Sequence, residues 1–163
     1  MTSPSITIRL ATEEDTPFIK AYIHELAEYE HAANDDHSTE EMLRENIFGQ
    51  GFAKVLIAEC DGEKAGFALW FNNFSTWLAR PGIYLEDLYV RPMFRRRGLG
   101  KMLLRRLAEI AVENGWGRVE WSCLKWNKPS LEFYDSLGAR QMDEWVTLRV
   151  DGGNLEHLGS KVS

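Results

Sequence analysis

The chain has 163 residues, of which 44% are hydrophobic and 12% aromatic, and it carries a formal net charge of −6. This composition is that of a soluble globular protein with one buried core, and it excludes an intrinsically disordered chain. No apolar run approaches the roughly 20 residues that cross a bilayer, and residues 1–9 lack a secretory signal pattern. The acidic charge opposes binding to nucleic acid and to membrane surfaces, so we expect neither partner.

The two cysteines and the histidines do not indicate a metal site. Cys60 and Cys123 lack metal-ligand or CxxC spacing and lie in strand-like runs. We expect both to be buried thiols in a reducing cytoplasm, with a disulfide as the lesser alternative. His24 is followed four residues later by Glu28 instead of a second histidine, so no HExxH zinc motif forms.

The first half of the chain is predicted to form a strand, two helices and a hairpin. Alternation predicts the strand, and capping boxes that begin at Thr12 and Ser38 predict the helices. The polar stretch 30–37 between the helices is predicted to be a solvated loop. Asp61-Gly62 is a hairpin signal. The predicted elements are a strand at 5–10, helices at 12–29 and 38–48, and strands at 52–60 and 64–73.

The second half continues as alternating strands and helices. Gly115 ends a long amphipathic helix, and Asn127 and Gly138 bound a shorter one. The predicted elements are strands at 83–90, 119–124, 140–142 and 145–150, helices at 99–114 and 127–137, a loop at 72–81, and a polar tail from 151 whose end we expect to be loose. This order predicts an α/β fold in which helices cover both faces of one mixed sheet. The whole chain is predicted to be one domain, with a core at about 6–150.

A basic, glycine-containing run, Arg95–Gly100, joins the strand at 83–90 to the long helix. Orphan amides and the helix dipole favour negative charge at such a helix start, which predicts a phosphate site. Leu103 stands where a dinucleotide fingerprint needs its third glycine, and Met102 stands where a P-loop needs Ser or Thr. The run resembles the R/Q-x-x-G-x-G/A loop of the GNAT superfamily of N-acetyltransferases, which holds the pyrophosphate of acetyl-CoA.

Further local motifs resemble the spermidine/spermine (diamine) N-acetyltransferases of that superfamily. The chain reads ELAEYE at 25–30, GFA at 66–68, LEDLYV at 85–90, WNKPS at 126–130 and FY…GA at 133–139. These motifs match in order and spacing over about residues 6–150. The resemblance implies the GNAT fold, acetyl-CoA as co-substrate, a small cationic amine as acceptor, no metal, and a homodimer with acceptor sites near the subunit interface.

The resemblance also implies roles for individual residues. Tyr134 matches the general acid of the family. The residues that match cofactor contacts are Leu88, Tyr89, Val90, Arg95, Arg96, Arg97, Gly98, Leu99, Gly100, Lys101, Asn127 and Ser130. The residues that match the lining of the acceptor site are Tyr29, Glu30 and Glu86. Arg96 replaces a glycine of the family loop, which makes the loop more cationic than usual.

The chemistry of amide formation gives two of these residues a task. An alkylamine of pKa about 10.4 arrives charged and must lose a proton. Glu86 and Asp87 adjoin on a strand and are expected to point to opposite faces, so one can face the acceptor. We expect Glu86 to bind the ammonium and accept its proton through a water; the alternative is a solvated carboxylate. The Tyr134 phenol can protonate the departing thiolate, or it is one more core aromatic.

The choice of acceptor rests on fewer residues. Trp77 is expected to wall the acceptor pocket and contact a cationic amine through its ring face, or else to be a core side chain. Glu144 and Trp145 are the candidates to replace an acidic residue and a tryptophan that the family uses, because segment 141–145 is shorter here. The main prediction is a diamine or polyamine acceptor. The alternatives are an amino acid or peptide amine of the thialysine or lysine type, and a low-turnover sensor of acyl-CoA or polyamine.

Overall fold

The computed structural model describes residues 2–161, which divide into two compact units between Leu124 and Lys125. The first unit holds one five-stranded mixed sheet in the order β1-β2-β3-β4-β5. Neighbouring strands are antiparallel except for β4 and β5, which are parallel. The strands are β1 (Ile6–Leu10), β2 (Lys54–Cys60), β3 (Glu63–Ser75), β4 (Arg80–Val90) and β5 (Val119–Trp121).

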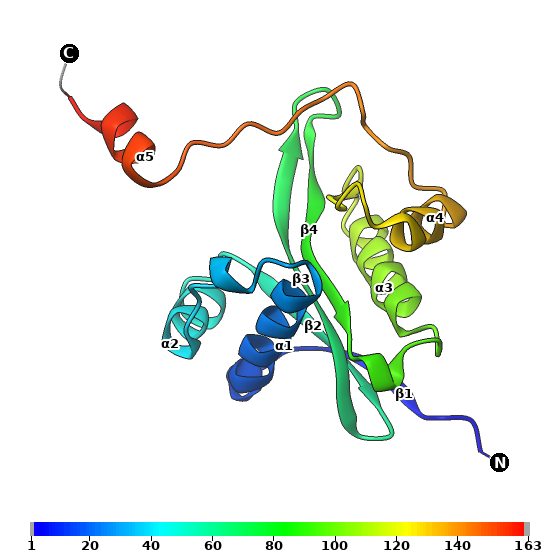
Figure 1. The fold of residues 1–163 in the computed structure, drawn as a ribbon. Coiled ribbons are helices and arrows are strands. Elements are labelled where there is room, and N and C mark those ends of the chain that lie inside the picture. The colour runs from blue at the N-terminus through cyan, green and yellow to red at the C-terminus, as the bar shows by residue number, and fades with distance from the viewer. Residues whose placement is uncertain (1, 162–163) are drawn as a thin grey trace. The chain divides into compact units, whose positions relative to one another are not determined.

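Helices cover both faces of this sheet, as predicted. Figure 1 shows α1 and α3 on opposite sides of the strands. None of the helices among the described residues has the length and apolar content that crossing a membrane requires. The helices of the first unit are α1 (Thr16–Tyr29), α2 (Glu40–Leu43) and α3 (Leu99–Glu113), with short 3-10 turns η1 (Glu13–Asp15), η2 (Ala33–Asp35) and η4 (Pro92–Phe94), and a π-helix η3 (Arg44–Gly49).

The core under α1 explains why this helix docks on the sheet. Ile19 and Tyr22 of α1 are fully buried, and the Tyr22 ring lies 5.7 Å from that of Phe67 on β3. Leu26, one turn after Tyr22, is also buried, whereas Phe18, one turn before it, is partly exposed. The Phe18 ring packs against the ammonium of Lys64 instead of against the core.

A buried ion-pair network fixes the start of α1 to the first strand. Asp15 is almost fully buried and accepts hydrogen bonds from both terminal nitrogens of Arg9, at 2.8 and 2.9 Å. Lys64 adds an ion pair to Asp15 at 3.2 Å, and the predicted capping box with Thr12 is confirmed. The hydrogen bonds from Arg9 are the largest cause that holds the pKa of Asp15 well below its usual range.

The two hairpins of the sheet differ from one another in how well they were predicted. Asp61 and Gly62 both have positive φ, 52° and 81°, and form the predicted turn between β2 and β3. The predicted loop at 72–81 is wrong, because β3 runs to Ser75 and β4 begins at Arg80. The polar Asn side chains and Pro81 gave this segment the sequence pattern of a loop. Pro81 lies in the part of β4 that pairs with β3 but has no partner in β5.

The second unit contains α4 (Lys128–Ser136) and α5 (Gly152–Gly159). The predicted strands at 140–142 and 145–150 are wrong, since the structure has no strand after Trp121 within residues 2–161. Alternation indicates a strand only where a neighbouring strand satisfies the backbone groups. Helix α5 lies in the predicted polar tail, and the end of that tail at 162–163 lies outside the described residues.

Candidate active site

Strand β4 carries a β-bulge in the middle of its length. Leu69 of β3 pairs with Asp87 and Trp70 pairs with Leu85, so Glu86 is the extra residue. Bulges redirect side chains and are frequent beside active sites, because they interrupt the regular alternation of a strand. The expectation that Glu86 and Asp87 point to opposite faces assumed a regular strand, and the bulge removes that assumption.

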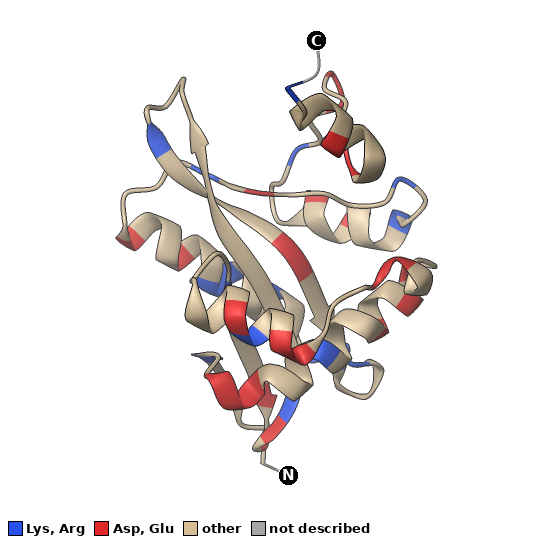
Figure 2. Ribbon diagram, turned by 90° about the vertical axis from the view of Figure 1, so that its left-hand side faces the viewer, with Lys and Arg blue, Asp and Glu red and all other residues tan. Residues whose placement is uncertain are grey.

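Three carboxylates around this bulge interact electrostatically. Glu86 is exposed, Asp87 is partly buried, and Glu30 directly follows the last residue of α1. Burial, as the largest cause, and the charges of Glu86 and Glu30 raise the pKa of Asp87 from 3.8 to about 7. Burial and then the charge of Glu86 also raise the pKa of Glu30. Figure 2 shows acidic segments, drawn red, on the sheet as well as on the helices. Such a cluster attracts a cation.

The cluster lies where β4 and β5 part. Strand β5 pairs with β4 only over Ile83–Leu85, although β4 continues to Val90. The charge of Glu30, after burial, contributes to the raised pKa of Cys123, which follows β5 by two residues. Beyond the paired residues, β4 therefore has no described strand on its β5 side. The predicted cofactor contacts of Leu88–Val90 fall on this open stretch, where the backbone groups that are not bonded to β3 can meet a ligand.

The end of β4 leads into the start of α3, as predicted. Gly98 precedes α3 with φ of +79°, and no side chain caps the helix there. The amide of Met102 makes the first bond back, to the carbonyl oxygen of Gly98 at 2.9 Å. The N–H groups of Leu99, Gly100 and Lys101 therefore precede the helical ladder, and the helix dipole adds positive partial charge to them. This geometry suits a phosphate.

The three loop arginines differ in what they contact. Arg95 donates from Nε to the carbonyl oxygen of Val90 at 2.9 Å. Arg97 contacts the sulfur of Cys60 from Nη1 at 3.4 Å. Arg96 has φ of +64°, a left-handed conformation that costs a residue with a side chain about 1 kcal/mol. None of the three forms an ion pair with a residue of the described range 2–161. Their charges are therefore available to an anion.

The predicted acceptor residues are only partly brought together. Glu30 and Glu86 belong to the carboxylate cluster, and Tyr29 ends α1 with the Arg95 guanidinium 5.5 Å from its ring centre. Trp77 is 90% exposed in the turn between β3 and β4. Six residues of β4 separate that turn from the bulge residue Glu86, which corresponds to roughly 20 Å of strand. Within one chain, Trp77 lies apart from the cluster.

The remaining predicted residues belong to the second unit. Asn127 caps α4 and accepts a hydrogen bond from the amide of Ser130 at 3.4 Å. Tyr134 lies on α4 with its ring 5.4 Å from that of Phe133. Glu144 lies in an exposed stretch without regular structure. The predicted helix carrying Tyr134 is confirmed, and the role of each residue stays a prediction.

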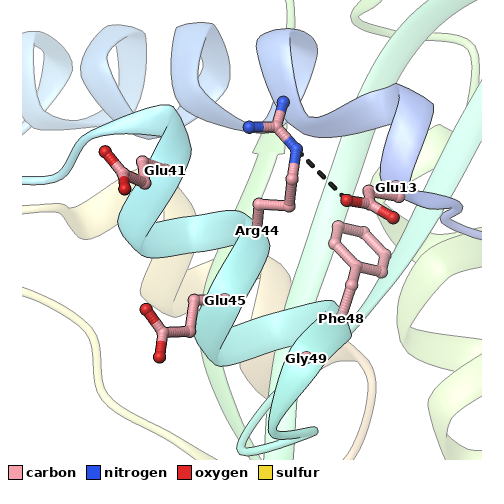
Figure 3. A pocket seen from close by; sticks show the side chains of 6 residues that line it. All are labelled: Glu13, Glu41, Arg44, Glu45, Phe48 and Gly49. Atoms are coloured by element: carbon pink, nitrogen blue, oxygen red, sulfur yellow. Dashed lines mark ion pairs between the residues drawn. The ribbon is translucent and has the colours of Figure 1, made fainter.

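A hollow of about 370 Å³ lies elsewhere on the first unit, against η1, α2 and η3. Figure 3 shows Arg44 reaching from η3 to Glu13, with which it forms an ion pair at 3.3 Å. Phe48 closes one side of the hollow. No residue of the carboxylate cluster or of the arginine loop lines it.

Sequence reasoning missed two carboxyl groups. Asp87 was recognised only as the neighbour of Glu86, although burial gives it the raised pKa. Asp36 was assigned to a solvated loop, but its side chain is only 3% exposed. The Asp-rich stretch 35–36 gave no signal that separates one buried carboxylate from an exposed one. No group of three or more potential metal ligands forms within residues 2–161.

Comparison with known proteins decides the family. The profile of the Acetyltransferase (GNAT) family matches residues 18–139, which is most of the chain. The chain belongs to the GNAT acetyltransferase family. This finding confirms the predicted family and fold, and it makes the protein an N-acetyltransferase. The family uses acetyl-CoA, which agrees with the open β4 edge and the amide-rich start of α3.

This acetyltransferase is similar over most of its length to proteins of known sequence or structure. It is 37% identical to a thialysine N-epsilon-acetyltransferase of Sus scrofa, over 96% of this chain and 99% of the relative. It is 32% identical to an L-ornithine N5-acetyltransferase of Arabidopsis thaliana, over 93% of this chain and 86% of the relative. An integron cassette protein from the mobile metagenome of V. cholerae has a similar solved structure, with TM-score 0.80, 25% identity, and coverage of 96% of this chain and 99% of that one.

Proposed function

We propose that this acetyltransferase acetylates the side-chain amine of a small cationic amino acid of the thialysine, lysine or ornithine type. The carboxylate cluster of Glu30, Glu86 and Asp87 carries the proposal, because it is suited to an ammonium group beside the open edge of β4. The names of the full-length relatives support an amino acid acceptor. The diamine or polyamine, which was the main sequence prediction, becomes the second candidate. Three carboxylates in one cluster favour it, since a diamine carries two positive charges.

The residues at the β4–α3 junction fit acetyl-CoA. The backbone groups of Leu88–Val90 that are not bonded to β3 can hydrogen-bond the pantetheine amides, and the amides of Leu99–Lys101 can hold the pyrophosphate. The charges of Arg95, Arg96 and Arg97 add to the attraction for its phosphates. Bound acetyl-CoA supplies the activated acetyl thioester.

We assign the proton transfer from the acceptor to Asp87, with Glu86 as the group that holds the ammonium. The amine has a pKa of about 10.4, so transfer to a carboxylate of pKa about 7 costs about 5 kcal/mol. Transfer to a carboxylate of ordinary pKa, about 4, costs about 9 kcal/mol. The raised pKa of Asp87 therefore reduces the difference in pKa between the base and the amine, which favours general base catalysis. The sequence alone had favoured Glu86.

Tyr134 is the proposed general acid. A free phenol has a pKa near 10, so giving its proton to a thiolate whose thiol has a pKa of about 8.5 costs about 2 kcal/mol, a small cost for a positioned acid. The support is the match of Phe133-Tyr134 on a helix capped by Asn127, which the structure contains. Loss of the hydroxyl is expected to slow the departure of the sulfur.

We also propose a homodimer. Trp77 lies at an exposed hairpin tip, roughly 20 Å of strand away from the bulge. A second copy is therefore needed for Trp77 to border an acceptor site. Light scattering of the purified protein measures the mass, and a monomer would leave Trp77 without that role.

Release of CoA from acetyl-CoA, measured across a panel of amines, tests the proposed acceptor. The panel contains thialysine, lysine, ornithine, putrescine, spermidine and a short lysine peptide. Turnover of the amino acids at a kcat/KM at least tenfold above that of the diamines supports the proposal. The reverse order moves the acceptor to the diamines. Tight CoA binding without turnover of any amine favours a sensor and contradicts the enzymatic proposal.

A further inference from the structure

The connection between α1 and α2 is fastened to α1 by a buried aspartate. The Asp36 side chain is 3% exposed, and its Oδ2 accepts hydrogen bonds from Lys20 Nζ and from His24 Nδ1, the latter at 3.2 Å. Its Oδ1 accepts from the amide of Ser38 at 3.1 Å and from the Ser38 hydroxyl. One carboxylate therefore joins two turns of α1 to the residues that lead into α2.

Local backbone hydrogen bonds brace the segment between Glu30 and Asp36. Glu30 donates from its amide to the carbonyl oxygen of Leu26 at 2.9 Å, and Ala32 donates to Ala27 at 2.8 Å. The turn η2 follows, and the amide of Asp36 donates to the carbonyl oxygen of Ala33 at 3.3 Å. The segment from Glu30 to Asp36 is thus held at both ends and braced between them.

We propose that Asp36 is a positioning residue of the acceptor site, which fixes Glu30 beside Glu86 and Asp87 by fastening the α1–α2 connection. The inference rests on the proposed function, because it concerns the site that takes the cationic amine. Asp36 also contributes negative charge there, since its charge is among those that raise the pKa of Asp87.

Charge and geometry change together when Asp36 is altered. Lys20 and His24 face Asp36 from α1, and His24 also lies 3.5 Å from Glu28. An Asp36→Asn variant leaves the Lys20 ammonium without its counter-charge near a site that must bind a cation. We expect the KM for the amine to rise about fivefold, which is the size of effect expected when one charge near a partly buried site is removed. The KM for acetyl-CoA should not change, because its proposed contacts lie on β4 and α3.

Asp35 supplies the matched control. It neighbours Asp36, carries the same charge and is exposed, and Asp35→Asn removes that charge without removing the fastening. The experiment measures kcat and both KM values for the unaltered protein, Asp36→Asn and Asp35→Asn with the best amine of the panel. The acid limb of kcat/KM should also shift to lower pH in Asp36→Asn only, because a negative charge near Asp87 is lost while Glu30 and Glu86 remain.

The outcomes separate the two proposals. No turnover of any amine by the unaltered protein overturns the proposed function and this inference with it. Turnover by the unaltered protein, with equal amine KM values and pH profiles in the two variants, overturns this inference alone. Should Asp36→Asn fail to fold, Ser38→Ala keeps the charge and removes one hydroxyl bond to Asp36. A rise of about twofold in the amine KM is then expected, and an unchanged KM contradicts the positioning role.

Discussion

Asp87→Asn should make the protein more stable and less active at alkaline pH. The pKa of Asp87 is raised from 3.8 to about 7 in the folded protein, so folding favours the protonated carboxyl. Its contribution to stability is complete below about pH 4 and is lost as the pH rises through about 7. Asparagine resembles the protonated form at every pH, so the variant avoids this loss.

The size of the effect follows from the shift. The difference between 3.8 and about 7 corresponds to about 4 kcal/mol. Asp87 is partly exposed, and screening by solvent reduces the expected gain to about 2 kcal/mol. At pH 8 the free energy of unfolding of Asp87→Asn should exceed that of the unaltered protein by this amount. At pH 4 the two proteins should agree within about 0.5 kcal/mol.

Urea unfolding followed by circular dichroism at pH 4 and pH 8 measures both differences. Asp35→Asn, which changes an exposed carboxylate, should show no such dependence on pH. In CoA-release assays Asp87→Asn should lower kcat about 100-fold, a typical loss for a general base, and should abolish the acid limb near pH 7. Lower stability of Asp87→Asn at pH 8, or an acid limb that persists, would refute the assignment of a raised pKa to this base.

Four further substitutions test the fold and the acid. Gly66→Ala should destabilise by more than about 2 kcal/mol, because its Cβ would lie 2.5 Å from the carbonyl oxygen of Tyr89, whereas Gly100→Ala has open space and should stabilise by about 0.5 kcal/mol in thermal unfolding. Asp15→Asn should lower the free energy of unfolding by about 3 kcal/mol at pH 7, measured by urea unfolding. It should also remove the loss of stability below pH 4 that the lowered pKa of Asp15 causes, and an unchanged acid transition would contradict this prediction. Tyr134→Phe should keep the Kd for CoA measured by calorimetry while kcat falls at least tenfold, and unchanged turnover would remove Tyr134 as the acid.

Local signals predicted most of the first unit correctly. Thr12 with Asp15, Asp61 with Gly62, and Gly115 are turn and cap residues whose geometry depends on immediate neighbours, and each stands in the predicted place. The strands at 140–142 and 145–150 failed because pairing depends on a partner strand, which no short pattern encodes. The arginine loop and the start of α3 were predicted correctly for the same reason, because they follow one another directly in the sequence.

The carboxylate cluster was only half predictable. Glu30 and Glu86 were found through motif resemblance, but Glu86 was placed in a regular strand because a bulge leaves no mark in the letters LED. The raised pKa of Asp87 depends on burial and on charges from residues far away in the chain, Glu30 and Asp36. Such a property belongs to the tertiary structure, so a reading of neighbours in sequence cannot supply it.

The parting of β4 from β5 gives the cofactor a place in the stability of the protein. Beside residues 86–90 no strand bonds the β5 side of β4, and acetyl-CoA bound there would supply hydrogen-bonding partners that a strand otherwise provides. Any ligand that binds only the folded state stabilises it by RT ln(1 + [L]/Kd), about 2.7 kcal/mol at a hundredfold excess over Kd. The stability of this enzyme is therefore expected to rise with the concentration of acetyl-CoA.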